Sequence, residues 1–201
     1  NLLIINSFDS NSGRISKIIL YSNTIIASSW DGKIRKWNKN GTLINIYDSK
    51  NPIYCFAICE KYYVIGNKNG SVKLFDHINK KSKTLYLHNN EVNDVFISKS
   101  SNYIVTCSID GRIIIYNVKD KKKIVVESNT SATSIVISGD EKIIVSGSWD
   151  NTIKMWDISG KLLKSFIAHS EAVTTLDMSS DDKYILSGSY DKDIKIWSIR
   201  G

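Results

Sequence analysis

A twelve-residue pattern occurs five times in this chain of 201 residues, and it constrains the fold more than any other feature. The clearest copies are SGSWDNTIKMWD, which begins at Ser146, and SGSYDKDIKIWS, which begins at Ser187. The aromatic residues near the ends of the five copies are Trp37, Phe75, Tyr116, Trp156 and Trp197, at intervals of 38, 41, 40 and 41 residues. Because the interval is nearly constant, we expect an array of five equivalent units.

Each copy contains two β-branched runs separated by a short polar turn such as Asp31–Gly32, and this arrangement predicts a β-hairpin. An apolar-rich inner strand precedes each hairpin, and the five predicted inner strands are Ile15–Leu20, Ile53–Ile58, Val92–Ile97, Ala132–Ile137 and Val173–Met178. An outer strand follows the hairpin, as in Leu43–Ser49. Each unit is therefore predicted to contain four antiparallel strands.

With this repeat in register, the chain resembles the WD-repeat β-propeller family over essentially all of its residues. The resemblance implies an all-β fold in which residues 1–201 form a single domain, a β-propeller of five four-stranded antiparallel blades. Seven blades are usual in that family, so five is a departure from its pattern.

The N-terminal residues are predicted to close the propeller into a ring. Ile4–Ser10 matches the outer strand Leu43–Ser49 position for position, although no hairpin precedes it. The last hairpin stops at Trp197–Ile199 and leaves its blade without an outer strand. If the N-terminal strand completes the last blade, two exposed sheet edges are removed at once.

Composition narrows the class of protein further. No apolar run approaches the ~18 residues that a membrane-spanning helix needs. Cys55, Cys59 and Cys107 are interpreted as buried thiols in a reducing compartment, which predicts an intracellular, cytoplasmic protein, with the nucleus as an alternative. The net charge of +7 permits an anionic partner without requiring one.

The last repeat contains a histidine, a serine and an aspartate at spacings that suggest a hydrolase triad. The third repeat has equivalent residues at the same spacings, and a catalytic site is not normally copied from one repeat to the next. In the WD-repeat family these positions form a buried hydrogen-bond network with an aromatic residue. The resemblance therefore implies two structural tetrads, His169, Ser187, Asp191 and Trp197 in the last blade and His88, Thr106, Asp110 and Tyr116 in the third.

No other residues form a catalytic, metal or cofactor motif. His77 is solitary, no cluster of His, Cys and carboxylate residues has metal-ligand spacing, and no glycine-rich phosphate loop is present. We therefore expect a protein that is not an enzyme and has no catalytic residue, no metal and no cofactor.

The residue before the turn Asp or Asn of each hairpin is unusual, because three of the five are aromatic where turns favour small polar residues. The resemblance places these turns on one face of the propeller, called here the top face, where the family typically binds peptides and partner domains. The predicted partner-binding set is Trp30, Lys68, Ile109, Trp149 and Tyr190, with Arg14, Tyr54 and Glu91 at the starts of the inner strands. The alternative is that the large side chains only seal the gaps between blades.

The predicted function is a non-catalytic scaffold that binds a protein or peptide on this aromatic face. The alternative is a polyanion-binding module, for nucleic acid or anionic lipid, on the opposite face. Its candidate patch consists of Lys80, Lys81 and Lys83 in the second blade and Lys119, Lys121, Lys122 and Lys123 in the third. No aromatic residues interleave with these lysines to stack on bases, which favours a solvated surface. A small-ligand or sugar site repeated in each blade is a third option, and the unequal residues at the five tips disfavour it.

Overall fold

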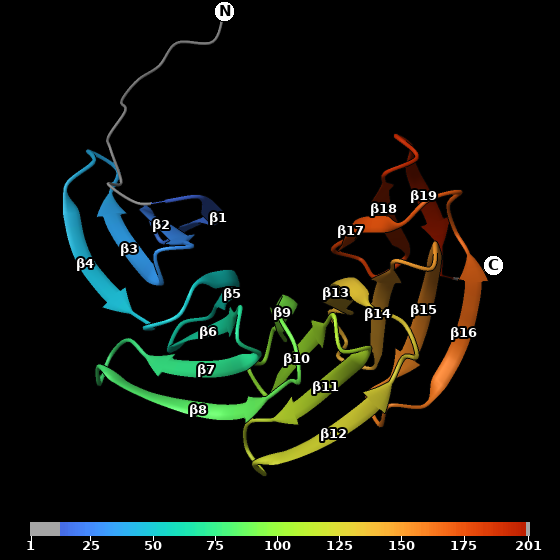
Figure 1. The fold of residues 1–201 in the computed structure, drawn as a ribbon, viewed down its shortest axis with the longest axis horizontal. Helices are drawn as coiled ribbons and strands as arrows, with labels where there is room; N and C mark the ends of the chain where they lie inside the picture. Colours follow the sequence, from blue (N-terminus) through green and yellow to red (C-terminus); the bar gives the residue numbers. More distant parts are fainter. Residues whose placement is uncertain (1–12, 200–201) are drawn as a thin grey trace, which may run out of the picture.

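The structure is a computed structural model, and it describes residues 13–199. Five antiparallel sheets are arranged around an arc, with one strand of each sheet near the centre and the others stepping outwards to the rim (Figure 1). Among the described residues every element is a β-strand. The predicted all-β architecture of five blades is confirmed.

The strands follow the chain from the centre of each blade to its rim. The first blade contains β1 (Ile15–Tyr21), β2 (Thr24–Ser29), β3 (Lys33–Asn38) and β4 (Leu43–Asp48), and the second contains β5 (Ile53–Ile58), β6 (Tyr62–Asn67), β7 (Ser71–Asp76) and β8 (Lys81–Leu87). The third contains β9 (Val92–Ile97), β10 (Tyr103–Ser108), β11 (Arg112–Asn117) and β12 (Lys122–Glu127), and the fourth contains β13 (Ala132–Ile137), β14 (Ile143–Ser148), β15 (Thr152–Asp157) and β16 (Leu162–Ile167). The fifth contains β17 (Val173–Met178), β18 (Tyr184–Ser189) and β19 (Ile194–Ser198). Four predicted inner strands have the observed bounds, and the first extends one residue further.

The apolar core lies between the blades. In the junction of the third and fourth blades, Val105 and Ile115 pack with Ile135, Ile144 and Trp156, all of them buried. Similar clusters join the other consecutive blades. The second, third and fourth blades each have a blade on both sides and thus bury both of their sheet faces. This explains why β10, β11 and β14 are rich in apolar residues on both faces rather than at alternate positions.

The fifth sheet has three strands among the described residues, and β19 is the last of them, in agreement with a last hairpin that was predicted to stop at Trp197–Ile199. The predicted closing strand near residues 2–8 lies outside the described residues, so closure by that strand stays a prediction. The first and fifth blades stand at the two ends of the arc (Figure 1), and within residues 13–199 no strand packing joins them of the kind that joins consecutive blades.

Two of the three cysteines occupy the expected environment. Cys55 and Cys107 are buried, and burial raises the pKa of each thiol. Cys59, which was expected to be buried, is only partly buried because β5 ends one residue before it. None of the three forms a disulfide.

Candidate functional site

The five hairpin tips between the second and third strands meet at one end of the blades. In every blade the residue before the turn Asp or Asn donates its backbone N–H to a carbonyl just before the inner strand. These hydrogen bonds are Trp30 to Arg14, Lys68 to Pro52, Ile109 to Glu91, Trp149 to Ser131 and Tyr190 to Ala172, at 2.9 to 3.1 Å. The structure therefore brings all five predicted tip residues to the same end, beside the starts of the inner strands.

A β-bulge occurs at the second residue of every inner strand. The bulge leaves one residue of the strand unpaired with its neighbour, and such residues are re-aimed relative to the regular strand. The five bulge residues are Ser16, Tyr54, Asn93, Thr133 and Thr174. All five line a central cleft of about 550 Å³. The bulges thus supply a ring of mostly polar side chains inside the aromatic tips.

The aromatic tips form two pairs that differ in exposure. Trp30 stacks on Tyr54 of the next blade with ring centroids 5.0 Å apart, and the Arg14 guanidinium lies 4.7 Å from the Trp30 ring centroid on the same tip. Trp149 lies 5.7 Å from Tyr190 of the next blade, and these side chains are 53% and 56% exposed. Trp30 therefore covers a junction between blades, whereas the Trp149–Tyr190 pair presents its rings to solvent.

Smaller clefts lie under both pairs. The cleft under the exposed pair measures about 200 Å³ and is lined by Asn93, Thr133, Trp149, Thr174 and Tyr190. The cleft next to Trp30 is lined by Arg14, Ile15, Ser16, Trp30, Tyr54 and Asn93. Asn93 contributes to both, so the two aromatic pairs border one continuous polar region at the mouth of the central cleft.

Charged residues of the predicted set lie at the same rim. The Lys68 ammonium is 4.0 Å from a Glu91 carboxylate oxygen, and the Tyr54 hydroxyl donates to Glu91 at 3.4 Å. Deeper in the central cleft, Asp94 accepts hydrogen bonds from the Ser134 hydroxyl and the Ile135 N–H, and its other oxygen lies 3.9 Å from Lys17. Burial raises the pKa of Asp94, and the contacts with Lys17 and these donors oppose that effect.

The fifth blade contains the complete tetrad in a hydrogen-bonded chain. His169 Nδ1 lies 2.8 Å from Asp191, His169 Nε2 lies 2.7 Å from the Ser187 hydroxyl, and the Trp197 indole N–H donates to the same hydroxyl at 2.8 Å. Burial alone would raise the pKa of Asp191. Hydrogen bonds from the Asp193 N–H, His169 and the Ser170 N–H lower it well below its ordinary value.

The third blade has the same arrangement with a different aromatic contact. His88 lies between Asp110, at 3.2 Å, and the Thr106 hydroxyl, at 2.9 Å. The hydroxyl that meets Thr106 belongs to Tyr86 of the outer strand, at 3.2 Å, while Tyr116 packs against Tyr86. Burial is the largest effect on His88 and lowers its pKa, although Asp110 opposes it.

In the first and fourth blades, which lack the histidine, a basic residue of the third strand hydrogen-bonds to the turn Asp. This residue was not predicted from the sequence. In the fourth blade the Lys154 ammonium donates to the Ser128 carbonyl at 2.8 Å and to Asp150 at 3.2 Å. In the first blade Arg35 donates to Asp31 at 2.5 Å. The available signal was a basic residue four positions after the turn Asp or Asn in four blades, at Arg35, Lys73, Lys154 and Lys195.

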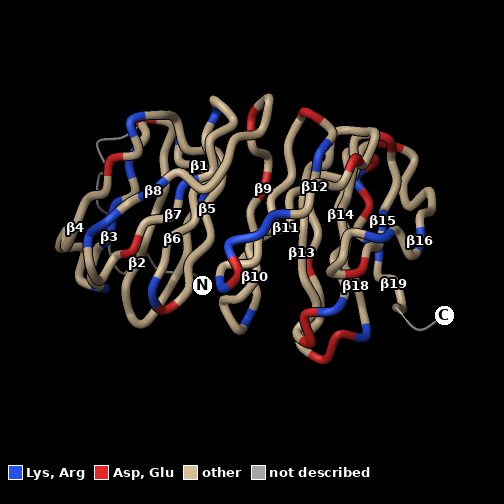
Figure 2. The backbone as a smooth tube through the Cα atoms, turned by 90° about the horizontal axis from the view of Figure 1, so that it is seen from below, with Lys and Arg blue, Asp and Glu red and all other residues tan. Residues whose placement is uncertain are grey.

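The seven lysines of the alternative patch are all exposed. Lys81, Lys83, Lys122 and Lys123 belong to the outer strands rather than to the turns, so the patch extends along the rim of the second and third blades. Acidic residues gather in the lower loops of the neighbouring blades, next to β13 and β18 (Figure 2). These loops contain Asp140, Glu141, Asp181 and Asp182.

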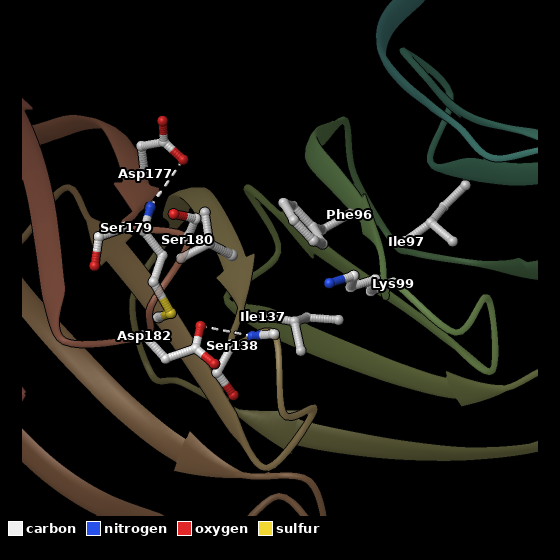
Figure 3. Close-up of a pocket in the computed structure, with 12 residues that line it drawn as sticks. Phe96, Ile97, Lys99, Ile137, Ser138, Asp177, Ser179, Ser180 and Asp182 are labelled. Carbon is white, nitrogen blue, oxygen red and sulfur yellow. Dashed lines mark hydrogen bonds between the residues drawn. The ribbon is translucent and has the colours of Figure 1, made fainter.

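A further cleft of about 290 Å³ lies at that lower end, between the third, fourth and fifth blades (Figure 3). Phe96 and Ile137 line it together with Asp177 and Asp182. Asp182 accepts the Gly139 N–H at 2.7 Å, so its carboxylate ties the fifth blade to the fourth. Across the described part of the chain, no group of His, Cys and carboxylate residues has an arrangement that would hold a metal ion.

Two family models match the chain. Residues 36–142, more than half of the chain, match the model described as "Vps42 beta-propeller", and residues 160–198 match the model described as "WD domain, G-beta repeat". The chain belongs to the WD-repeat β-propeller family. Protein-interaction scaffolding is typical of this family.

This WD-repeat propeller is similar to several curated proteins. It is 29% identical to Autophagy-related protein 16 of Arabidopsis thaliana over 76% of this chain and 31% of that protein. It is 23% identical to the Vacuolar protein sorting-associated protein 41 homolog of Solanum lycopersicum over 52% of this chain and 11% of that protein. The chain spans less than a third of the length of these relatives.

The WD-repeat propeller also resembles a solved structure, that of the computationally designed Ika8 protein, with a TM-score of 0.78 and 25% sequence identity. The match covers 92% of this chain and 58% of the designed chain. In the described part of the propeller no helix is long and apolar enough to cross a membrane.

Proposed function

We propose that this chain is a protein-interaction scaffold that binds a peptide segment of a partner protein on its top face, centred on Trp149 and Tyr190. The observation that carries the proposal is the exposed pair of rings, 5.7 Å apart, above a cleft lined by Asn93, Thr133 and Thr174. Aromatic side chains give a large contact area with few rotors to immobilise, and they are frequent hot spots of interfaces.

The polar floor of this cleft supports binding of a backbone rather than of an apolar ligand. The Thr174 hydroxyl donates to the Gly188 carbonyl at 3.0 Å, and the Asn93 amide donates to the Ala132 carbonyl at 2.7 Å. A hydroxyl oxygen that donates still has lone pairs that accept an N–H, and the oxygen of the Asn93 amide is an acceptor separate from the nitrogen that donates. A peptide lying across the rings finds acceptors below it.

Trp30 takes the sealing role that was the alternative for the aromatic tips. Its ring lies between Arg14 and Tyr54, so the exposed fraction of Trp30 is smaller than that of Trp149. Ile109, Lys68 and Glu91 lie between the two aromatic pairs in blade order. We assign them to the flank of the peptide site.

We propose that the role is non-catalytic. His169 bonds Asp191 and Ser187 as the histidine of a catalytic triad would, but Ser187 is buried and its hydroxyl also accepts the Trp197 indole N–H, which leaves it without access to a substrate. The polyanion-binding alternative is weaker than the peptide site because the acidic lower loops repel a polyanion that approaches the lysine rim from that end.

Selection of peptides on the immobilised chain tests the proposal. A phage-displayed random peptide library supplies ligands, and calorimetry measures their affinity for the parent and for the Trp149→Ala, Tyr190→Ala double variant. We expect the double variant to bind at least about thirtyfold more weakly, equivalent to ~2 kcal/mol. The matched control is Ile78→Ala, which removes an exposed apolar residue from the turn between β7 and β8, outside the proposed site.

The dependence of the binding affinity on salt concentration distinguishes the two candidate functions. Binding through the aromatic pair should change little between about 50 and 200 mM salt, whereas phosphate-driven binding falls steeply over that range. Selected peptides whose affinity is unchanged in the double variant while its fold is intact would overturn the proposed site. A ligand that is lost on raising the salt and on replacing Lys122 and Lys123 would favour the polyanion function.

A further inference from the structure

Trp30 and Trp149 hold the same position in the first and fourth blades but have different neighbours. The backbone N–H of each donates to the carbonyl of the residue just before its inner strand, which is Arg14 for Trp30, at 2.9 Å, and Ser131 for Trp149, at 3.0 Å. The repeat therefore places Arg14 and Ser131 at equivalent positions beside the two tips. The first blade has a guanidinium where the fourth has a hydroxyl.

The first blade shows what this position of the repeat accommodates. The guanidinium carbon of Arg14 lies 4.7 Å from the Trp30 ring centroid, within the ~6 Å over which a cation is attracted to the face of an indole. The Tyr54 ring of the next blade stacks on the same tryptophan. A guanidinium over the tip ring, supported by an aromatic ring of the next blade, is thus an arrangement that the hairpin tip can hold.

The fourth blade has the aromatic support without the cation. Tyr190 of the next blade lies 5.7 Å from Trp149, but no Lys or Arg side chain in the described part of the chain lies over the Trp149 ring. The Ser131 side chain is too short to cover an indole. Trp149 is accordingly 53% exposed, against 37% for Trp30.

A hydrogen-bond acceptor borders the open ring. Asn93 lines the cleft under Trp149 and Tyr190, and its amide nitrogen donates to the Ala132 carbonyl at 2.7 Å and to the Ser131 hydroxyl at 3.4 Å. These contacts use the nitrogen and leave the amide oxygen as an acceptor. A guanidinium that stacks on a ring keeps its planar set of N–H donors for such an acceptor, whereas an ammonium has no planar fork.

The charges at this end of the fifth blade favour a cation. Glu171 and Asp193 are both exposed, and the only exposed basic residue among these tip residues is Lys192. The Ser189 hydroxyl, next to Tyr190, donates to the Glu171 carbonyl at 3.1 Å, so Glu171 lies at the same tip as the aromatic pair. Complementary charge of this kind selects and orients a partner more than it adds affinity.

We propose that Trp149 is the binding site for an arginine side chain of the partner peptide. The guanidinium lies over the Trp149 ring on the side of Ser131, as that of Arg14 lies over Trp30, and donates to the amide oxygen of Asn93. The inference rests on the proposed function, because a peptide supplies the arginine, and it names the residue that anchors that peptide.

NMR titration with small probes tests the proposal without a selected ligand. The probe is acetyl-Gly-Arg-Gly-amide, and its matched control is the citrulline analogue, in which a neutral urea group of nearly the same shape replaces the guanidinium. The five tryptophans give separate indole N–H signals, and Trp149→Phe identifies the signal of Trp149. We expect the arginine probe to shift this signal saturably and the citrulline probe to bind at least about fivefold more weakly. The Trp30 signal should not respond, because Arg14 already occupies that ring.

Two substitutions exchange the properties of the tips. Ser131→Arg gives Trp149 a guanidinium of its own and should weaken binding of the arginine probe there at least about fivefold. Arg14→Ser should make the Trp30 signal respond to the same probe. The control is Ser131→Gln, which adds a long side chain without charge and should retain most of the binding. Unchanged signals of the three other tryptophans show that each variant is folded.

Equal affinities for the arginine and citrulline probes would overturn the proposal, as would an equal loss in Ser131→Arg and Ser131→Gln. If library peptides still depend on Trp149 and Tyr190 in that case, the peptide site stands and its anchor is apolar. If the arginine probe binds as expected while the library yields no ligand that depends on these rings, the guanidinium site stands and the proposed function fails.

Discussion

His169 Nε2 and the Ser187 hydroxyl lie 2.7 Å apart in the interior of the fifth blade, and the same hydroxyl accepts the Trp197 indole N–H at 2.8 Å. Ser187 is thus the shared partner of two side chains that come from different segments of the blade. A hydroxyl with two partners is costly to remove, because both partners lose a hydrogen bond in a place that water does not reach.

The substitution Ser187→Ala is expected to lower the free energy of unfolding by about 1–3 kcal/mol, because it leaves buried polar groups unpaired. Chemical denaturation measures the change. Ser165→Ala on the exposed outer strand serves as the control and should be close to neutral. A neutral Ser187→Ala variant would show that the tetrad contributes no stability.

The stability of the protein is expected to fall as the pH drops below the ordinary histidine pKa of about 6.5. Burial lowers the pKa of His88 in the folded state, so below pH 6.5 the unfolded chain binds a proton that the folded chain does not. The contribution of His88 is therefore present above its unfolded pKa and is lost as the pH falls through the folded pKa.

Denaturation midpoints between about pH 7 and pH 5 check this dependence. The variant His88→Gln removes the titrating group, so its midpoint should depend less steeply on pH than that of the parent. An identical slope in the two proteins would assign the pH dependence to other groups.

The substitution Lys154→Met is expected to destabilise the fourth blade, because the ammonium joins the Ser128 carbonyl, the Thr130 hydroxyl and Asp150. The expected loss is about 1–3 kcal/mol. It should also raise the pKa of Asp150, which hydrogen bonds from Thr152 and the charge of Lys154 hold at about 2 although burial opposes them. NMR titration of the carboxyl measures the second effect.

The control for that variant is Lys161→Met on the exposed turn before β16. Because the pKa of Asp150 is lowered, its stabilising contribution is present above the ordinary value and disappears as the pH falls towards 2. A Lys154→Met variant with an unchanged Asp150 titration would contradict the proposed pairing.

Gly147→Ala and Gly188→Ala form a matched pair, since both glycines sit at the same position of their second strands. A Cβ at Gly147 would come within 2.6 Å of Val173 in the next blade, whereas a Cβ at Gly188 meets Thr175 of its own blade at 3.0 Å and nothing from a following blade. Overpacking should make Gly147→Ala destabilising by about 1–3 kcal/mol. Thermal denaturation should show a clearly smaller effect for Gly188→Ala, and equal effects would contradict this explanation.

Much of the fold followed from the residues themselves. The strands Ile53–Ile58 and Val92–Ile97 were predicted with their observed bounds, because the apolar runs end at turn residues on both sides. The resemblance to the WD-repeat family assigned the hairpin tips of all five blades to one end. The number of blades followed from the constant interval between the aromatic residues.

The site was less predictable, because its character depends on contacts between blades. Trp30 and Trp149 occupy the same position of the repeat, yet Trp30 meets the ring of Tyr54, whereas the bulge residue next to Trp149 is Thr174. Lys154 was not singled out, because a lysine on a strand is ordinarily exposed. Only the position of the neighbouring turn shows that its ammonium is enclosed and replaces a histidine.

The bulge in each inner strand separates the residues that pair with the neighbouring strand from one residue that lines the central cleft. The bulge residues Ser16, Tyr54, Asn93, Thr133 and Thr174 are skipped by the strand pairing, although Asn93 and Thr133 donate to backbone carbonyls of the next blade. Substitutions at these five positions can therefore change the ligand during evolution while the strand pairing stays the same. A protein engineer can vary the same five positions to change specificity while the strand pairing stays intact.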